Sequence, residues 1–287
     1  MRLLFIGDII GRPGRELLRK GLKGLVDHHG VHFVIANAEN SAAGFGITKD
    51  IGDTLLEYGV DVMTSGNHVW DKKEALEYIA TERRLIRPAN YPAGAPGRGS
   101  YVAESGDGRP VGIVNVMGRV FMTPIDDPFA VVLKEIEALR SRTRVIVVDF
   151  HAEATSEKIA MGWHLDGKAT LVVGTHTHVQ SADERVLPNG TAYMTDAGMT
   201  GPHDGIIGME REPSLTRFLT GMSSKLEPAS ANPRLNGVLV SADEKTGRAT
   251  SVTRLSYSEH DLAALAASAK AESRIPNPET RLASPTK

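Results

Sequence analysis

Residues that can bind metal ions follow several apolar runs of this chain. The candidates are Asp8, Glu39, Asn40, Asn67, His68, His151, His176 and His178. The runs RLLFIG, HFVIAN, VDVMTS, RVIVVDF and ATLVVG precede them directly. Because the carboxyl ends of parallel strands lie along one edge of a sheet, we expect these side chains to meet in one crevice. Cysteine is absent, so His, Asn, Asp and Glu are the available donors.

These donors suit a centre of two metal ions. Two divalent ions about 3.5–4 Å apart need a bridging carboxylate, and together they activate water and neutralise charge on a phosphoryl group. His176 and His178, two residues apart after a strand, can face neighbouring ions, and Asn67 offers a neutral carbonyl oxygen. His68 is then an additional imidazole, which suits a general acid that protonates the leaving oxygen. The pattern predicts metal-dependent phosphoester hydrolysis.

Each of these residues also has a structural interpretation when taken alone. Asp8 can cap a helix or close a turn, and Glu39 and Asn40 can form a polar turn. His151 can be a core histidine whose hydrogen bonds are satisfied, and His68 can support its neighbour in the chain. Four histidines at strand ends argue against coincidence, so the metal centre is the stronger interpretation.

The motifs resemble a known superfamily. The spaced elements GD, NAEN, GNH, H and GTHTH are similar to those of the calcineurin-like metallophosphoesterases. The longer strings GDIIGRPGR, ANAENSAAGFGIT, TSGNHVWD, RPANYP and TDAGMTGP resemble the YmdB-like branch of that superfamily, over residues 1–255. Individually, GNH and GTHTH are moderately specific for this superfamily. Their order along the chain together with GDIIGRPGR and NAEN makes the combined resemblance strong.

The resemblance implies a role for each candidate. The first ion is bound by Asp8, His178 and Asn40, the second ion by Asn67, His151 and His176, while Glu39 bridges the two and His68 is the catalytic acid. The chain departs from the superfamily pattern where Ile10 replaces a histidine and Glu39 replaces a bridging aspartate. An oxygen of Asn40 in place of the imidazole makes the first site harder. We expect two divalent or mixed-valence metal ions, iron or manganese in preference to zinc.

The resemblance also implies a substrate class and self-association. The YmdB-like branch is associated with di-iron centres and with hydrolysis of phosphodiesters, including cyclic nucleotides such as 2',3'-cyclic or 3',5'-cyclic AMP. We expect a small phosphodiester or nucleotide substrate and a homo-oligomer. A phosphomonoesterase is the nearest alternative, and a two-metal peptidase or amidase is more distant. A regulatory nucleotide-sensing protein with weak turnover is an alternative of a different class.

The elements that position these residues can be predicted from the spacing of apolar residues. Strands are predicted over 2–7, 32–37, 60–65, 111–116, 144–150, 169–174, 191–196 and 237–242. Helices are predicted over 14–28, 48–58, 72–80 and 128–140, with a hairpin around ADEKTGRATSVTRL and little helix between the later strands. The expected fold is a metallophosphoesterase-like α/β sandwich of two mixed sheets, packed face to face and flanked by helices.

Composition limits the domain organisation and the partners. We expect one domain over residues 1–258, and over 259–287 a C-terminal helix and a flexible tail, RIPNPETRLASPTK. The Pro- and Gly-rich residues 87–100 predict an ordered surface loop.

With 33 basic and 35 acidic residues and a formal charge of −2, non-specific nucleic-acid binding is not expected. No apolar stretch predicts a membrane span or signal peptide, which favours a cytoplasmic location.

The loop 196–209, DAGMTGPHDGIIGM, has two open interpretations. It can close over a substrate and bring His203 or Asp204 near the site, or it can be an ordinary surface loop or subunit contact. Asn90 in RPANYP has the same ambiguity. No chemistry is assigned to the other histidines, which are His28, His29, His32, His164 and His260.

Overall fold

The computed structural model describes residues 1–272. In chain order its elements are β1 (Arg2–Ile6), β2 (Asp8–Ile9), α1 (Gly11–His29), β3 (Phe33–Asn37), α2 (Lys49–Glu57), β4 (Val62–Thr64), α3 (Ala75–Thr81), β5 (Ser100–Glu104), β6 (Pro110–Met117), α4 (Pro128–Leu139), β7 (Ile146–His151), α5 (Thr155–His164), β8 (Leu171–Thr175), β9 (Arg185–Val186), β10 (Ala192–Met194), β11 (Met199–Pro202), α6 (Arg211–Thr220), β12 (Pro233–Ala242), β13 (Ala249–Ser258) and α7 (Glu259–Glu272). Residues 273–287, which include the predicted tail, lie outside the described part.

The strands form two mixed sheets. The first has the order β2-β11-β12-β1-β3-β4, with β13 paired to β12, and the second has the order β5-β6-β7-β8-β10-β9. Strands β1, β3 and β4 are parallel to one another, as are β6, β7, β8 and β10. The carboxyl ends of each parallel group therefore lie along one edge of its sheet.

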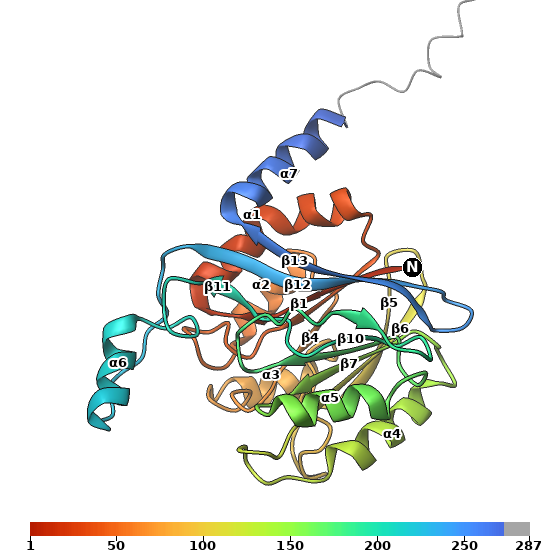
Figure 1. The fold of residues 1–287 in the computed structure, drawn as a ribbon, viewed down its shortest axis with the longest axis horizontal. Helices are drawn as coiled ribbons and strands as arrows, with labels where there is room; N and C mark the ends of the chain where they lie inside the picture. Colours follow the sequence, from red (N-terminus) through yellow and green to blue (C-terminus); the bar gives the residue numbers. More distant parts are fainter. Residues whose placement is uncertain (273–287) are drawn as a thin grey trace, which may run out of the picture.

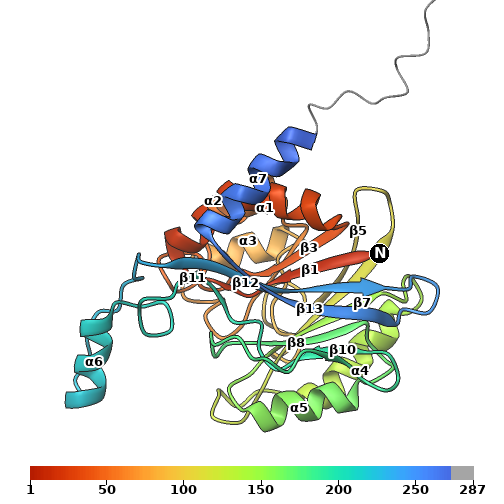
Figure 2. The ribbon, with the colours of Figure 1, turned by 45° about the horizontal axis from the view of Figure 1, so that its top comes forward.

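Helices cover the outer faces of both sheets (Figures 1 and 2). Apolar residues of β1, β3 and β12 pack with those of β6, β7 and β8 in a core between the sheets. A second core joins the first sheet to α1, α2, α3 and α7, and a third joins the second sheet to α4 and α5. The four layers confirm the predicted α/β sandwich.

Local sequence accounts for the main helices. In α1 the buried Leu18, Leu22 and Leu25 recur at helical spacing, so one face of the helix packs on the sheet. The side chain of Thr48 accepts a hydrogen bond from the Ile51 backbone and caps α2. Asp127 caps α4 in the same way, and proline follows it at the first helical position.

The predicted strands and helices are all present, with shifts of a few residues at their ends. The hairpin is confirmed as β12 and β13, which pair antiparallel. The expectation of little helix between the later strands is wrong, because α6 lies between β11 and β12. The sequence analysis also missed α5, because its buried positions include the charged residues Glu157 and Lys158, so apolar residues do not mark the buried face. Within residues 1–272, no helix combines the length and apolar character needed to cross a membrane.

Helix α6 projects from the body of the molecule at the end opposite the β12–β13 turn (Figures 1 and 2). Ser214 is its only buried residue. Leu215, Phe218, Leu219 and, just beyond the helix, Met222 are exposed, and they recur at helical spacing. The helix therefore carries an apolar stripe that the rest of the described chain does not cover.

Candidate metal centre

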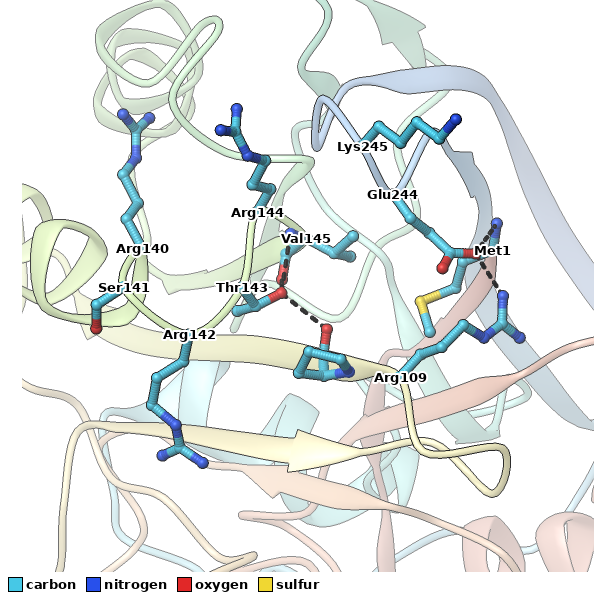
Figure 3. Close-up of a pocket in the computed structure, with 11 residues that line it drawn as sticks. Met1, Arg109, Arg140, Ser141, Arg142, Thr143, Arg144, Val145, Glu244 and Lys245 are labelled. Atoms are coloured by element: carbon cyan, nitrogen blue, oxygen red, sulfur yellow. Dashed lines mark hydrogen bonds and ion pairs between the residues drawn. The ribbon is translucent and has the colours of Figure 1, made fainter.

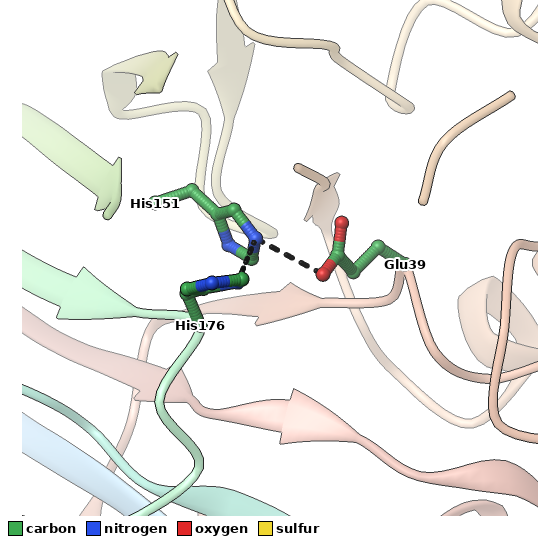
Figure 4. Close-up of side chains that lie close together, drawn as sticks. All are labelled: Glu39, His151 and His176. Carbon is green, nitrogen blue, oxygen red and sulfur yellow. Dashed lines mark hydrogen bonds and ion pairs between the residues drawn. The ribbon is translucent and has the colours of Figure 1, made fainter. Parts of the chain in front are cut away.

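The two sheets bring all eight predicted site residues together at the carboxyl ends of β1, β3, β4, β7 and β8. Glu39, His151 and His176 form the centre of the cluster, with potential ligand atoms all within 4.8 Å of one another (Figure 4). Glu39 belongs to the first sheet and lies far along the chain from both histidines, which follow strands of the second sheet. Only the packing of the two sheets places them side by side.

One group of acceptor atoms surrounds the Nε2 atom of His151. Nε2 lies 2.9 Å from Oδ1 of Asn67, 3.0 Å from Oε1 of Glu39 and 3.1 Å from Nδ1 of His176. Glu39 and His151 are fully buried. Lone pairs that face one another at this range repel unless a cation or a proton lies between them, so the group has the character of a metal site.

A second group surrounds the Nε2 atom of His178. It lies 3.8 Å from Oδ1 of Asp8 and 3.2 Å from the side-chain amide of Asn40. The Asn40 amide also lies 3.4 Å from Oε1 of Glu39, which therefore stands between the two groups. Asp8 is completely buried, and its Oδ1 has no hydrogen-bond partner in the described chain. A buried carboxylate oxygen without a partner is costly, and a cation would satisfy it.

Each of the three histidines has its other ring nitrogen held by an acceptor. Nδ1 of His151 donates to Thr175, whose hydroxyl in turn donates to Asp149. The same arrangement pairs the His176 Nε2 with a carboxylate oxygen of Glu153 at 3.1 Å, and the His178 Nδ1 with the Ile207 carbonyl at 2.9 Å. In the neutral form of each histidine these bonds fix the tautomer and leave the lone pair on the nitrogen that faces the cluster, as in metal-binding histidines.

Burial and mutual charge set the protonation of the cluster. Burial opposes ionisation of Glu39, but the adjacent His151 outweighs it and lowers the pKa of this carboxyl to about 2. Burial also opposes the charge of His151, but Glu39 outweighs it and raises the pKa of the imidazole to about 9. Burial and the neighbouring His151 lower the pKa of His176 to about 3. Burial raises the pKa of Asp8.

His68 lies at the exposed side of the cluster. Its backbone N–H donates to Oε2 of Glu39 at 3.0 Å, and its Nδ1 lies 2.8 Å from a carboxylate oxygen of Asp71. Because a carboxylate only accepts, Nδ1 carries the proton, and Nε2 is the atom free to exchange protons with a substrate. The Phe45 ring packs edge-on against the imidazole, with ring centroids 5.0 Å apart.

The backbone around the cluster is unusual. His176 and His178 have φ angles of 95° and 65°, in the left-handed region that residues with a side chain avoid. Such strain persists where the surrounding structure enforces it, and it concentrates at functional sites. A Cβ at Gly66 would lie 2.2 Å from the His151 ring, so glycine is required where this backbone passes the cluster.

The cluster opens into a cavity of about 430 Å³. One part of its wall is polar and contains Glu39, Asn40, His68, His176 and His178. The rest is mainly apolar and contains Gly44, Phe45, Ile206, Ile207, Met209, Phe218 and Leu226, with Ser214 and Arg217. The loop 196–209 therefore borders the site through Ile206, Ile207 and Met209.

The structure gives His203, Asp204 and Asn90 other partners. Nε2 of His203 pairs with Asn236, and its Nδ1 pairs with the Gly201 carbonyl. Asp204 accepts from Asn232. Asn90 is buried. Its Nδ2 donates to the Met117 carbonyl, and its Oδ1 accepts from the Met117 backbone N–H. These side chains hold the loops in place and are absent from the wall of the cavity.

The sequence analysis missed the residues that hold the histidines. Asp149 is fully buried, and burial raises its pKa to about 7 although Thr64 and Thr175 donate to it. Its only sequence signal is a charged residue inside the apolar run RVIVVDF. Lys158 and Asp196 form a buried ion pair at 2.5 Å, and Asp196 also accepts from the Thr177 hydroxyl. That pair supports the loop between His176 and His178.

Known proteins similar in sequence to this chain extend over most of its length. The profile of a family described as YmdB-like protein matches residues 4–255. The chain is 47% identical over 256 residues to a Bacillus subtilis (strain 168) protein named 2',3'-cyclic-nucleotide 2'-phosphodiesterase, covering 89% of this chain and 96% of that one.

Two solved structures have a similar fold. A hypothetical protein from Thermus thermophilus superposes with a TM-score of 0.84 at 41% identity, covering 90% of this chain and 99% of the other. A novel phosphatase from Mycoplasma pneumoniae superposes with a TM-score of 0.84 at 34% identity, covering 90% and 93%. Both similarities extend over almost the whole of the compared chains.

Proposed function

Because the chain belongs to the YmdB-like family, whose homologues are phosphatases and phosphodiesterases of the metallophosphoesterase type, we propose that it is a metal-dependent phosphodiesterase acting on cyclic nucleotides. The observation that carries this proposal is the cavity that joins a cluster of metal ligands to an apolar wall. The name of the Bacillus subtilis relative favours 2',3'-cyclic nucleotides as the first candidate substrates, and 3',5'-cyclic AMP is the second candidate.

The donor set fits two metal ions. We assign Asp8, Asn40 and His178 to one ion and Asn67, His151 and His176 to the other, with Glu39 shared between them. The unpartnered oxygen of Asp8 and the inward lone pairs of the histidines support this assignment. A 180° rotation of the Asn40 amide would turn its oxygen toward His178. Carboxylate and amide oxygens with imidazoles suit iron or manganese.

Two bound ions would supply a nucleophile from water at neutral pH and neutralise charge on the phosphoryl oxygens. The protein residues orient and protonate the substrate. Asp71 holds the Nδ1 proton of His68, so the protonated ring would deliver its second proton, on Nε2, to the departing ribose oxygen and return to the neutral imidazole. Glu39 holds the His68 backbone, which fixes this imidazole at the edge of the ligand cluster.

The apolar wall of the cavity favours a substrate that contains a nucleoside over one that is a phosphate group alone. Phe45, Ile207 and Phe218 line the same cavity as the ligand cluster, and Phe218 is 78% exposed. A base stacked on an aromatic side chain gains about 1–3 kcal/mol. A cyclic nucleotide places its phosphate and its base at opposite ends, which matches the polar and apolar parts of this cavity.

We further propose that copies of the chain associate through α6. Leu219 and Met222 are 81% and 62% exposed on the apolar stripe of this projecting helix. An exposed stripe at helical spacing is typical of a helix that packs against a partner. Leu219→Lys would place a charge in that interface, so we expect sedimentation to show a smaller species than wild type. An unchanged sedimentation coefficient would exclude α6 as the interface.

The test of the activity uses protein stripped of metal and titrated separately with Mn²⁺, Fe²⁺ and Zn²⁺. Its substrates are 2',3'-cyclic AMP, 3',5'-cyclic AMP, 3'-AMP as a monoester and a peptide amide. Metal-dependent turnover of a cyclic nucleotide in excess of the monoester supports the proposal. Preference for the monoester would make the protein a phosphatase, and amide hydrolysis would make it a peptidase. Tight nucleotide binding with negligible turnover would indicate a nucleotide sensor.

A further inference from the structure

A concentration of basic residues lies at the edge of the molecule opposite the metal centre. Arg144 precedes β7, Lys168 precedes β8, and Arg248 lies in the turn between β12 and β13. The metal ligands follow the carboxyl ends of strands, so Arg144 and Lys168 occupy the opposite, amino-terminal edge of the second sheet. Arg248 lies beside them because the β12–β13 turn packs on that edge. The chain as a whole carries a formal charge of −2, which makes this basic region a local feature.

Two grooves run through this basic region. The first encloses about 430 Å³ between Arg109, the segment 140–145 and Lys245 (Figure 3). The second encloses about 550 Å³ between Lys168, Arg248 and the arginines Arg140 and Arg144. Arg140 and Arg144 line both, so the two grooves are adjacent and share a wall. Neither groove shares a lining residue with the cavity of the metal centre.

Most of the cations in these grooves have no acidic partner. Arg109 pairs with Asp107 and Glu244, and Glu244 also pairs with the N-terminal ammonium, so those charges offset one another. No ion pair within residues 1–272 involves the remaining cations, which are Arg140, Arg142, Arg144, Lys168, Lys245 and Arg248. In Figure 3 the guanidinium groups of Arg140 and Arg144 extend to the same side, and Arg142 extends to the other.

The backbone beneath these cations is fixed. The Thr170 hydroxyl donates to the Gly247 carbonyl at 2.6 Å, which ties the β12–β13 turn to the second sheet. A Cβ at Gly247 would lie 2.1 Å from the Arg144 carbonyl, so the turn packs directly on the segment before β7. Thr143 likewise donates to the Pro110 carbonyl at 2.8 Å. The cations therefore stand on a rigid frame rather than on a mobile tail.

We propose that the two basic grooves bind the phosphodiester backbone of a single-stranded nucleic acid such as RNA, contrary to the expectation drawn from the net charge of the whole chain. Neutralisation of phosphates by lysine and arginine provides the sequence-independent part of nucleic-acid binding. Two adjacent grooves with cations along both suit a chain of phosphates better than a single phosphate group. No aromatic side chain lines either groove, so binding would occur through the backbone with little preference among bases.

The residues that line the two grooves also argue against binding to a membrane surface. The cations line grooves, and the large exposed apolar residues of the described chain are absent from both linings. A peripheral membrane site would combine basic residues with apolar side chains that enter the lipid. The inference is independent of the proposed phosphodiesterase activity, because it uses neither the metal ligands nor the apolar wall.

The test measures fluorescence anisotropy of a labelled 12-nucleotide oligouridine with the full chain at several salt concentrations. We expect a dissociation constant of about 1–100 µM, the range of non-specific binding, and a slope of log K against log salt of about −2 to −4. The double variant Arg144→Glu, Arg248→Glu should bind at least about tenfold more weakly, with a slope reduced by about 1 for each residue. Arg142→Gln with Lys245→Gln should weaken binding in the same direction.

The control is Lys23→Glu with Arg83→Glu, which changes the net charge equally on exposed residues away from the grooves. It should bind the oligonucleotide within about twofold of wild type. Equal losses in the control and in the groove variant would overturn the site, as would the absence of binding at 50 mM salt. Equal affinity for inorganic polyphosphate of the same charge, or capture by phosphatidylserine vesicles, would overturn the assignment to RNA.

Cyclic-nucleotide hydrolysis serves as the independent readout. The groove variants should retain wild-type hydrolysis, because their substitutions lie at the opposite edge of the sheets from the metal centre. If RNA binding is lost while hydrolysis persists, the basic grooves form a separate site. If hydrolysis is absent in wild type and RNA binding persists, the proposed function fails and this inference stands.

Discussion

Replacing Thr175 by valine would remove the hydroxyl that connects Asp149 to His151 while nearly preserving the shape of the side chain. In the wild-type structure the hydroxyl accepts from His151 Nδ1 at 2.9 Å and donates to Asp149 Oδ1 at 2.7 Å. All three residues are buried. The valine would leave the His151 Nδ1 and the Asp149 Oδ1 without a hydrogen-bond partner. It would also remove the contact that fixes the His151 tautomer.

The expected loss follows from these two contacts. Leaving a buried polar group unpaired costs about 1–3 kcal/mol, so the unfolding free energy of the metal-free variant should fall by about 2–4 kcal/mol. Asp149 retains donors at its other oxygen, Thr64 and Asn37, which limits the loss. Removing a group that orients a metal-binding histidine lowers metal affinity or activity by about 10–100-fold.

Two measurements separate stability from metal binding. Urea unfolding of metal-free protein gives the free energy, and competition between protein and a chelating dye for Mn²⁺ gives the affinity. Thr175→Ser is the matched control, since it keeps the hydroxyl and should bind Mn²⁺ nearly as wild type does. Wild-type affinity in the valine variant, or an equal loss in the serine variant, would refute the role of this hydroxyl in orienting His151.

Three further predictions concern the same site. His68→Ala should bind Mn²⁺ normally and lose about 10²–10⁴-fold in turnover of cyclic nucleotide. Asp8→Ala or His176→Ala should lose Mn²⁺ binding in the dye competition as well as turnover. Equal metal loss in all three variants would contradict the division between a catalytic acid and metal ligands. Phe45→Ala should raise KM for 2',3'-cyclic AMP and leave KM for ribose 2',3'-cyclic phosphate, which has no base, unchanged, and equal effects on both would exclude a base contact. In metal-free protein, burial disfavours the charge of His151, but Glu39 outweighs that effect and raises the pKa of the imidazole above its unfolded value to about 9. The charged His151 therefore stabilises the folded state fully below pH 6.5, and this contribution to the unfolding free energy is lost as the pH rises through 9. Urea midpoints at pH 6.5 and 9.5 measure that loss, and His151→Gln should reduce it; the same loss in the variant would assign it to another group.

The positions of the candidate ligands were predictable because each follows a buried strand. A run such as RVIVVDF can only be buried, and the polar residue that ends it must then lie at the edge of the sheet. The order of the GNH and GTHTH motifs identified the family, and the matching profile confirms that assignment. The α/β fold followed from alternating strand and helix patterns, without knowledge of strand order.

Other features left no local pattern in the sequence. Asp71 and Glu153 touch His68 and His176 through contacts that depend on loop conformation. Helix α6 has too little buried surface for its apolar residues to indicate a core-facing helix. The basic grooves combine residues from four separate loops, and the near-neutral total charge concealed them.

The sequence by itself determined which residues end the strands and therefore which donors are available for chemistry. Periodicity and residue type are local properties, so they can be read without the fold. Residue type and spacing alone did not group these donors, although the family resemblance implied the grouping. The tertiary structure places His151 beside Asn67 and Glu39 between the two groups, and it alone decided that an apolar wall adjoins them. Those relations depend on the order of strands and on the packing of one sheet against the other, which bring together residues that have no proximity along the chain.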